Sequence, residues 1–304
     1  MKRVFGILLV SLMAAPVSAQ VIDGSRDVVY GAPLAVQTVE TQFGDANPNN
    51  GSELNAGYAT ISGGFLNLML TGNLESNFNK LEIFIDSKAG GQGVFDSSGN
   101  DNAQVMDGLV FDAGFTADYH VIARRGSDGS GPKFDLDFAD LAAQTASGYF
   151  DVLIGGGDAG VGATGTGVNA LPIAVGYDNS NTAGVAGGTG PANQAAAAAV
   201  TTGLELSIAL SDLDYAGGEI CIMVGQNNGD HNYWSNQFLG GLPAPQGNLG
   251  GDEMGGFTGE GAINMNNFGG EQFFCVGAIP EPSTLALAGL CGLGAALGRL
   301  RRKK

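Results

Sequence analysis

Short runs of apolar residues, each bounded by turn-forming residues, recur along most of the chain. In KLEIFID (residues 80–86), leucine and isoleucine at every second position alternate with Glu82, Phe84 and Asp86, the pattern of a half-buried strand. Comparable runs predict further strands at residues 65–72, 107–115, 118–126, 133–141, 149–157, 204–213, 219–227 and 271–277. No long amphipathic helix pattern precedes the C-terminal tail, so we expect an all-β fold, an antiparallel β-sandwich.

One long segment breaks this pattern. Residues 155–190 contain 12 glycines, and alanine, threonine and asparagine fill much of the rest. Such a composition offers few large apolar side chains to offset the entropy of ordering the chain. We therefore expect a glycine- and alanine-rich loop over residues 155–200, with a short helical turn at residues 195–199. A linker between two half-domains is the alternative. Residues 248–270 are also expected to be a loop.

The first 19 residues have the layout of a secretory signal peptide. Lys2 and Arg3 precede an apolar stretch over residues 4–15, and the small residues Val17-Ser18-Ala19 follow it. A buried N-terminal helix is the alternative. We expect signal peptidase to cleave after Ala19 and to leave a body of residues 20–278.

The C-terminal segment, residues 279–304, combines three features. Residues 283–300 are apolar and just long enough to cross a membrane if the flanking arginines snorkel. The basic residues that follow would remain cytoplasmic. Pro280 and Pro282 are tolerated before the first turn of such a transmembrane helix. Glu281, between them, has no role in anchoring and indicates recognition by a processing enzyme.

The order Pro280-Glu281-Pro282, apolar helix and basic tail resembles the PEP-CTERM sorting segment of Gram-negative exopolysaccharide-producing bacteria. The resemblance implies that Pro280, Glu281 and Pro282 are recognised by an exosortase, a membrane cysteine transpeptidase. It also implies that the helix holds the chain in the inner membrane only transiently and is then removed. The protein would be delivered to the cell surface or the extracellular matrix.

Charge is distributed unevenly along the chain. Seven of the 13 basic residues lie at the two ends, and all 30 acidic residues lie between those ends together with only six basic ones. A body this acidic repels nucleic acid and anionic lipid headgroups, so we expect no nucleic-acid partner. Divalent cations or neutral sugars would suit it better.

Three segments of the body resemble DOMON-like and family 9 carbohydrate-binding sandwiches. They are IDGSRDVVYG (residues 22–31), as the entry strand, TGNLESNFNKLEIFIDSKAGG (71–91) and TTGLELSIALSDL (201–213). The resemblance implies a jelly-roll or DOMON-like sandwich and a glycan ligand. Family 9 binders use a pair of tryptophans, whereas this chain has only Trp234.

The best candidate for a glycan site is the segment NNGDHNYWSNQFL (residues 227–239). It places His231, Tyr233 and Trp234 among amide side chains, and aromatic rings with amides are how binding modules hold sugars. The alternative is that Trp234 and Phe238 fill one end of the core.

The remaining candidate chemistry is sparse. Cys221 and Cys275 lie in strand-like segments of the exported body, where an oxidising compartment favours a disulfide; two buried free thiols are the alternative. The segment 96–107 (DSSGNDNAQVMD) clusters oxygen ligands that suit calcium, although it does not match an EF-hand loop, and its residues are also ordinary turn formers. We expect no other metal and no cofactor.

These observations favour a non-catalytic exported protein that associates with exopolysaccharide. The two histidines show no metal-binding spacing, and no nucleophile elbow is present. A secreted carbohydrate-active hydrolase with an unrecognised acidic site remains an alternative, as does a purely structural matrix protein.

Overall fold

The computed structural model describes residues 20–46, 51–258 and 263–277. The predicted signal peptide (1–19) lies outside these residues, as do the predicted sorting motif and transmembrane helix (283–300). Within the described ranges, no helix is both long and apolar enough to cross a membrane.

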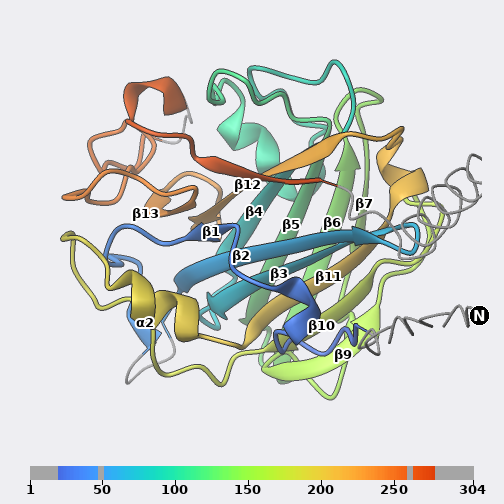
Figure 1. The fold of residues 1–304 in the computed structure, drawn as a ribbon, viewed down its shortest axis with the longest axis horizontal. Coiled ribbons are helices and arrows are strands. Elements are labelled where there is room, and N and C mark those ends of the chain that lie inside the picture. Colours follow the sequence, from blue (N-terminus) through green and yellow to red (C-terminus); the bar gives the residue numbers. More distant parts are fainter. Residues whose placement is uncertain (1–19, 47–50, 259–262, 278–304) are drawn as a thin grey trace, which may run out of the picture.

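The fold consists of two antiparallel sheets. The first sheet has the order β1 (Ala35–Val36), β2 (Glu53–Ser62), β3 (Phe65–Asn73), β11 (Gly203–Ala209), β10 (Ala174–Asp178), β9 (Ala159–Ala163) and β8 (Leu153–Ile154). The second has the order β13 (Trp234–Leu239), β12 (Glu219–Asn227), β4 (Lys80–Asp86), β5 (Tyr119–Ser127), β6 (Pro132–Asp140) and β7 (Thr145–Tyr149), and β14 (Phe273–Gly277) also pairs with β12. Figure 1 shows β2 and β3 lying in front of β4, β5 and β6.

The main core lies between the two sheets. Leu68 and Leu206 from the first sheet join Ile83, Val121 and Leu136 from the second in one buried apolar cluster. Fully burying each such side chain contributes roughly 1.5–3 kcal/mol, so this cluster is the principal stabilising feature. The predicted all-β, antiparallel architecture is confirmed, whereas the jelly-roll or DOMON-like type stays a prediction.

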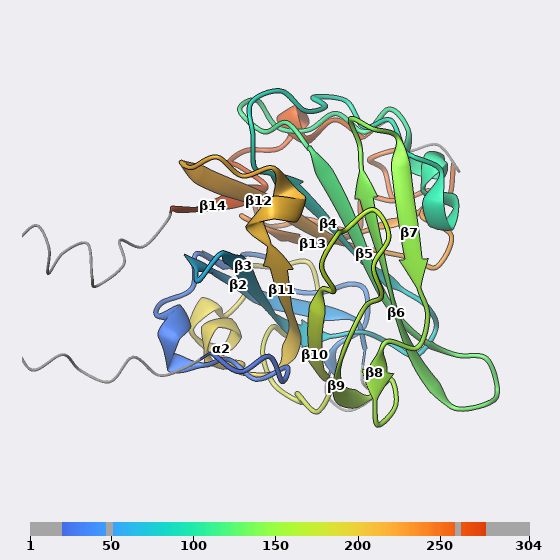
Figure 2. The same ribbon diagram turned by 90° about the vertical axis from the view of Figure 1, so that its right-hand side faces the viewer.

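A second apolar cluster covers the other face of the second sheet. Phe84 of β4 and Ile122 of β5 point away from the main core and pack with Met106, Phe111 and Trp234. Met106 belongs to the 3-10 segment η2 (Asn100–Met106), which lies on the outer side of β6 and β7 in Figure 2. Strands β4 and β5 are consequently buried on both faces, which fixes where their alternating polar residues must lie.

Three predicted strands differ from the structure. Residues 107–115 make only isolated bridges, because Gly108 and Gly114 adopt positive φ and let the apolar residues between them pack onto the second sheet. Residues 149–157 contain only the last residue of β7 and the two-residue β8. The expected entry strand at residues 22–31 instead holds a 3-10 turn, η1 (Val28–Tyr30).

The expectation of one long loop over residues 155–200 is also wrong, because this segment contains β9 and β10. Val175 and Tyr177 of β10 are buried, and they supply the apolar surface that the composition seemed to lack. In β9, a Cβ on Gly162 would come within 1.8 Å of the Val152 carbonyl oxygen, so glycine permits the close approach to the preceding chain.

The remaining helical elements are short. Helix α2 (Gln194–Ala199) lies where a helical turn was expected, and the Asn193 side chain caps it by accepting a hydrogen bond from Ala196 N at 3.2 Å. Two further 3-10 turns are η3 (Leu210–Leu213) and η4 (Met265–Asn267).

Candidate functional site

The outer face of the second sheet carries an unusual set of buried charges. Strand alternation, which points Leu81, Ile83 and Ile85 into the main core, turns Lys80 and Glu82 to the opposite face. The same alternation on β5 and on β6, the next two strands of the sheet, gives this face four more polar residues: His120, Arg124, Asp135 and Asp137. All six are less than 10% exposed. Because isolated buried charges are very costly, each must have a charged or hydrogen-bonding partner.

Glu82 is the deepest member of this charge network. It is fully buried, with His231 Nδ1 2.7 Å from Oε1 and His120 Nε2 2.9 Å from Oε2. Burial alone would raise the pKa of Glu82, but the charge of His231 and the hydrogen bonds from both histidines hold it below its usual range. Glu82 is therefore ionised at neutral pH.

His231 is the cation that balances Glu82. Burial lowers its pKa, but the carboxylates of Glu82 and Asp101 outweigh burial and raise the pKa to about 9. The protonated ring donates from Nδ1 to Glu82 and from Nε2 to the main-chain oxygen of Asp101, 2.8 Å away. The loop that carries His231 is thereby tied to both β4 and η2.

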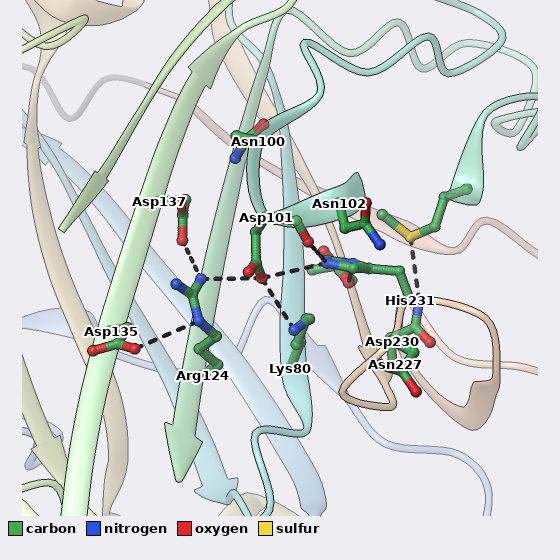
Figure 3. Close-up of polar contacts among 12 residues, drawn as sticks. Lys80, Asn100, Asp101, Asn102, Arg124, Asp135, Asp137, Asn227, Asp230 and His231 are labelled. Carbon is green, nitrogen blue, oxygen red and sulfur yellow. Dashed lines mark hydrogen bonds and ion pairs between the residues drawn. The ribbon is translucent and has the colours of Figure 1, made fainter. Parts of the chain in front are cut away.

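Asp101 connects the two halves of the network, as Figure 3 shows. Its Oδ2 lies 3.0 Å from Lys80 Nζ, 3.1 Å from Arg124 Nη1 and 3.3 Å from His231 Nε2. Burial opposes ionisation, but the His231 hydrogen bond and the two other cations lower the pKa of Asp101 overall. Arg124 is also ion-paired with Asp137 and, at 3.6 Å, with Asp135.

The backbone is strained where it supplies these side chains. Asp101, Asn102 and His231 have φ values of 46°, 66° and 58°, the left-handed region that non-glycine residues seldom adopt. Such conformations persist only where surrounding contacts enforce them. Here the ion pairs of Asp101 and His231 supply those contacts.

Four loops next to the charge network line an open groove of about 460 Å³. It is lined by residues of the loops after β1, between β3 and β4, between β12 and β13, and after β13: Gln42, Phe43, Gly44, Glu75, Asn77, Asn79, Asn228, Tyr233, Asn248 and Phe257. Asn79 directly precedes the network residue Lys80, and Asn228 and Tyr233 flank His231. The contacts of Lys80 and His231 thus fix the chain next to three residues that line the groove.

Three aromatic rings stack along the groove. The Tyr233 and Phe257 ring centroids are 4.1 Å apart with 22° between the planes, and Phe43 lies 6.3 Å from Tyr233 at 12°. Phe257 is 69% exposed, so a flat apolar surface faces solvent here. Asn248 Nδ2 contacts the Tyr233 hydroxyl at 3.4 Å.

The groove loops are held by amide and hydroxyl hydrogen bonds. Ser52 Oγ accepts from Glu75 N at 3.1 Å and from Asn79 Nδ2 at 3.2 Å. Gln42 Oε1 accepts from Asn248 N at 3.0 Å, which joins two loops far apart in sequence. These contacts order the walls, and the side chains of Gln42, Asn77, Asn228 and Asn248 are exposed or partly exposed there.

A second buried carboxylate lies close to the groove. Glu53, which follows Ser52 on β2, is 1% exposed, and it accepts from Ala46 N at 3.1 Å, Asn55 Nδ2 at 2.5 Å and Asn181 Nδ2 at 3.3 Å. Burial outweighs these neutral donors and raises the pKa of Glu53 to about 7.

The structure separates the three residues predicted to bind glycan. Tyr233 is partly exposed in the groove, but Trp234 and His231 are buried, at 0% and 1%. Trp234 begins β13 and packs against Phe238 with ring centroids 5.2 Å apart, because alternation turns it toward the second apolar cluster. The prediction that a sugar stacks on Trp234 or contacts His231 is therefore wrong. Trp234 instead fills the core, which was the alternative interpretation.

The other predicted residues have clear positions. Cys221 and Cys275 form a disulfide between directly opposed residues of β12 and β14, with Cα atoms 4.0 Å apart.

The segment 96–107 was the candidate for calcium binding. In it, Asp101 is engaged by three cations and Asp107 accepts a hydrogen bond from Ser97 N, which does not favour a shared calcium ion. The described residues contain no group of three or more His, Cys, Asp or Glu placed to hold a metal.

Sequence reasoning missed the charge network and most of the groove. A usable signal for the network was present, since three successive predicted strands each carry two ionisable residues on one face, two or four positions apart: Lys80 and Glu82, His120 and Arg124, and Asp135 and Asp137. Phe43, Glu75 and Phe257 have no local signal, because only the fold brings them together.

Comparison with known proteins identifies one segment of the chain. The model of the PEP-CTERM protein-sorting motif matches residues 278–303, which include Pro280, Glu281 and Pro282 and lie outside the described residues. This match confirms the resemblance of the tail and is consistent with an exosortase substrate. It implies export, membrane-anchored sorting and exosortase processing. No curated protein and no solved structure matches the chain, so the DOMON-like and family 9 resemblance of the body stays a prediction.

Proposed function

We propose that this protein is a non-catalytic surface or extracellular-matrix protein that binds exopolysaccharide in the groove beside Tyr233. Export and exosortase processing follow from the sorting motif at residues 278–303. The ligand is inferred from the groove, and the stacked rings of Phe43, Tyr233 and Phe257 carry that inference.

The groove has the two chemical features that a sugar ligand requires. The C–H face of a pyranose packs on an aromatic ring, and Phe257 offers an exposed one. The sugar hydroxyls need both donors and acceptors, which the exposed or partly exposed amides of residues 42, 77, 228 and 248 supply. The groove is open rather than enclosed, as suits an internal segment of a polymer.

The same geometry is the reason to propose binding rather than hydrolysis. Glycoside hydrolysis usually needs two carboxyl groups flanking the scissile bond. Among the described lining residues only Glu75 is acidic, while Glu82 and Asp137 are buried in ion pairs with other residues. A hydrolase would show turnover on a polysaccharide panel, and we expect none.

The test compares two exposed phenylalanines in the exported protein. Phe257→Ala should weaken polysaccharide binding about tenfold, equivalent to about 1.4 kcal/mol, because it removes a stacking surface. Phe65→Ala is the matched control, since Phe65 is 37% exposed at the start of β3 and does not line the groove. Affinity electrophoresis through gels that contain each polysaccharide measures both variants.

Two results would count against the proposal. Equal retardation of the Phe257→Ala and Phe65→Ala proteins would place binding elsewhere. No retardation of the unmodified protein by any polysaccharide would leave the structural matrix role as the better account.

A further inference from the structure

The cations of the body are all engaged. Each of the six basic residues between the two termini has a partner in the described structure. Lys80 and Arg124 pair with Asp101, Lys88 with Asp214, Arg125 with Asp158 and Lys133 with Asp151, whereas Arg26 donates to the Tyr58 hydroxyl and lies over its ring. Of these, only Arg26 lacks a carboxylate partner among the described residues, so an anionic polymer, such as one rich in uronic acids, would find few unpaired cations on this part of the chain to neutralise its carboxylates.

The groove itself is acidic. Its lining includes no lysine, arginine or histidine, and its one charged side chain is Glu75. Glu75 is exposed, its main chain is fixed by the hydrogen bond to Ser52, and one carboxylate oxygen accepts from Asn77 Nδ2 at 2.9 Å. A carboxylate oriented in this way beside aromatic rings suits a cationic group.

We propose that the groove binds an amino-sugar chain, a hexosamine polymer in which at least some amino groups are free and protonated. This inference rests on the proposed function and names the ligand class of the same site. The sugar ring packs on the exposed Phe257 ring, which is itself stacked on Tyr233, and the ammonium group pairs with the Glu75 carboxylate. The ring faces add a cation–π contribution.

The field of the whole body acts in the same direction. The stretch between the basic termini carries 30 acidic and six basic residues, so it attracts a polycation before any specific contact is made. This long-range attraction is screened by salt, whereas stacking is not. Salt dependence therefore separates the two contributions.

The experiment uses the exported protein and three short oligosaccharides of equal length. They are a glucosamine oligomer, its N-acetylated form and a uronic acid oligomer. Binding is measured by calorimetry at a mildly acidic pH, at which the amines are charged, and at about 0.05 M and about 0.5 M salt. We expect the glucosamine oligomer to bind about tenfold more tightly than the acetylated one at low salt, and the uronic acid oligomer not to bind.

A pair of charge-matched variants tests the role of Glu75. Glu75→Gln should abolish the preference for the free amine while binding of the acetylated oligomer persists. Glu219→Gln removes the same charge from an exposed residue outside the groove and should retain the preference.

Each contrary outcome has a distinct meaning. Equal binding of the free and acetylated oligomers, both lost in Phe257→Ala, would overturn the amino-sugar inference and leave the glycan site intact. If the Glu75→Gln and Glu219→Gln proteins prefer the free amine equally, the preference comes from general attraction by the acidic surface and not from Glu75. Binding of none of the three oligomers, with no retardation in the polysaccharide gels, would overturn both proposals.

Discussion

Two buried carboxylates, Glu82 under the η2 segment and Glu53 at the start of β2, have opposite electrostatic settings. Each is at most 1% exposed and accepts at least two hydrogen bonds. The pKa of Glu82 is lowered below its usual range, whereas that of Glu53 is raised to about 7. Burial disfavours ionisation at both sites, so the difference comes from the partners: His231 carries a positive charge, and the amides around Glu53 are neutral.

The comparison shows what each region contributes to the groove. The Glu82 region locks the strained His231 loop through ion pairs, so it specifies a loop position as well as adding stability. The Glu53 region lies next to Ser52, whose hydroxyl oxygen accepts from Glu75 and Asn79, and this region is destabilised when Glu53 ionises. The Glu82 region is therefore expected to be insensitive to mild acid, and the Glu53 region to be strengthened by it.

The strongest way to break this comparison is Glu82→Gln. The substitution keeps the shape but leaves His231 without its buried counter-ion, and removing one partner of a buried pair costs about 3–5 kcal/mol. We expect a loss of that size in chemical denaturation, together with weaker polysaccharide binding because the loop bearing Asn228 and Tyr233 loses its support. An unfolding free energy within about 1 kcal/mol of the unmodified protein would show that the network is not a stabilising unit.

The pH dependence of stability gives the next largest effect. The folded-state pKa of His231, about 9, lies above its unfolded value of about 6.5, so the protonated histidine contributes stability in full below pH 6.5. That contribution, about 3 kcal/mol, should be lost as the pH rises through 9. Denaturation at a series of pH values measures it. The His231→Gln protein is the control, and its unfolding free energy should not show this decline. The same dependence of unfolding free energy on pH in both proteins would contradict the attribution to His231.

The smallest expected effect is a gain. Because the folded-state pKa of Glu53 is raised to about 7, the unmodified protein loses stability as the pH rises from about 4.5 through 7. Glu53→Gln should remove that slope and stabilise the protein by about 1 kcal/mol above pH 7, a gain limited because the new amide faces groups that are already donors. Thermal unfolding above pH 7 detects this gain in stability. A variant less stable than the unmodified protein would mean that the ionised Glu53 carboxylate is well solvated in the folded state.

Alternation made the strands of the second sheet predictable. The predicted bounds of KLEIFID and EICIMVGQN coincide with β4 and β12, because large apolar residues at every second position leave little ambiguity. Strand β2 (ELNAGYATIS) gave no such signal because small residues dominate it. At Gly57 a Cβ would lie 2.8 Å from the Phe274 ring, so small size there is a requirement of packing that the local sequence does not reveal.

The candidate site was predictable only in part. Tyr233 was identified because aromatic and amide residues cluster around it in sequence. Phe43 and Phe257 lie more than 200 residues apart and meet through loops whose path depends on hydrogen bonds such as that between Gln42 and Asn248. The burial of Trp234 depends on the register of β13. The sequence pattern alone did not predict that register.

The disulfide between β12 and β14 has a mechanical consequence. The sorting motif starts at residue 278, directly after β14, so any tension on the body while the motif is held in the membrane would enter at Gly277. In an antiparallel pair loaded from its end, hydrogen bonds would open one after another, beginning with the pair Gly277 and Glu219. The bond from Cys275 to Cys221 halts this peeling after two residues and passes the force to β12, which is held along its length by β4. The fold is thus reinforced at the point where a tether would pull.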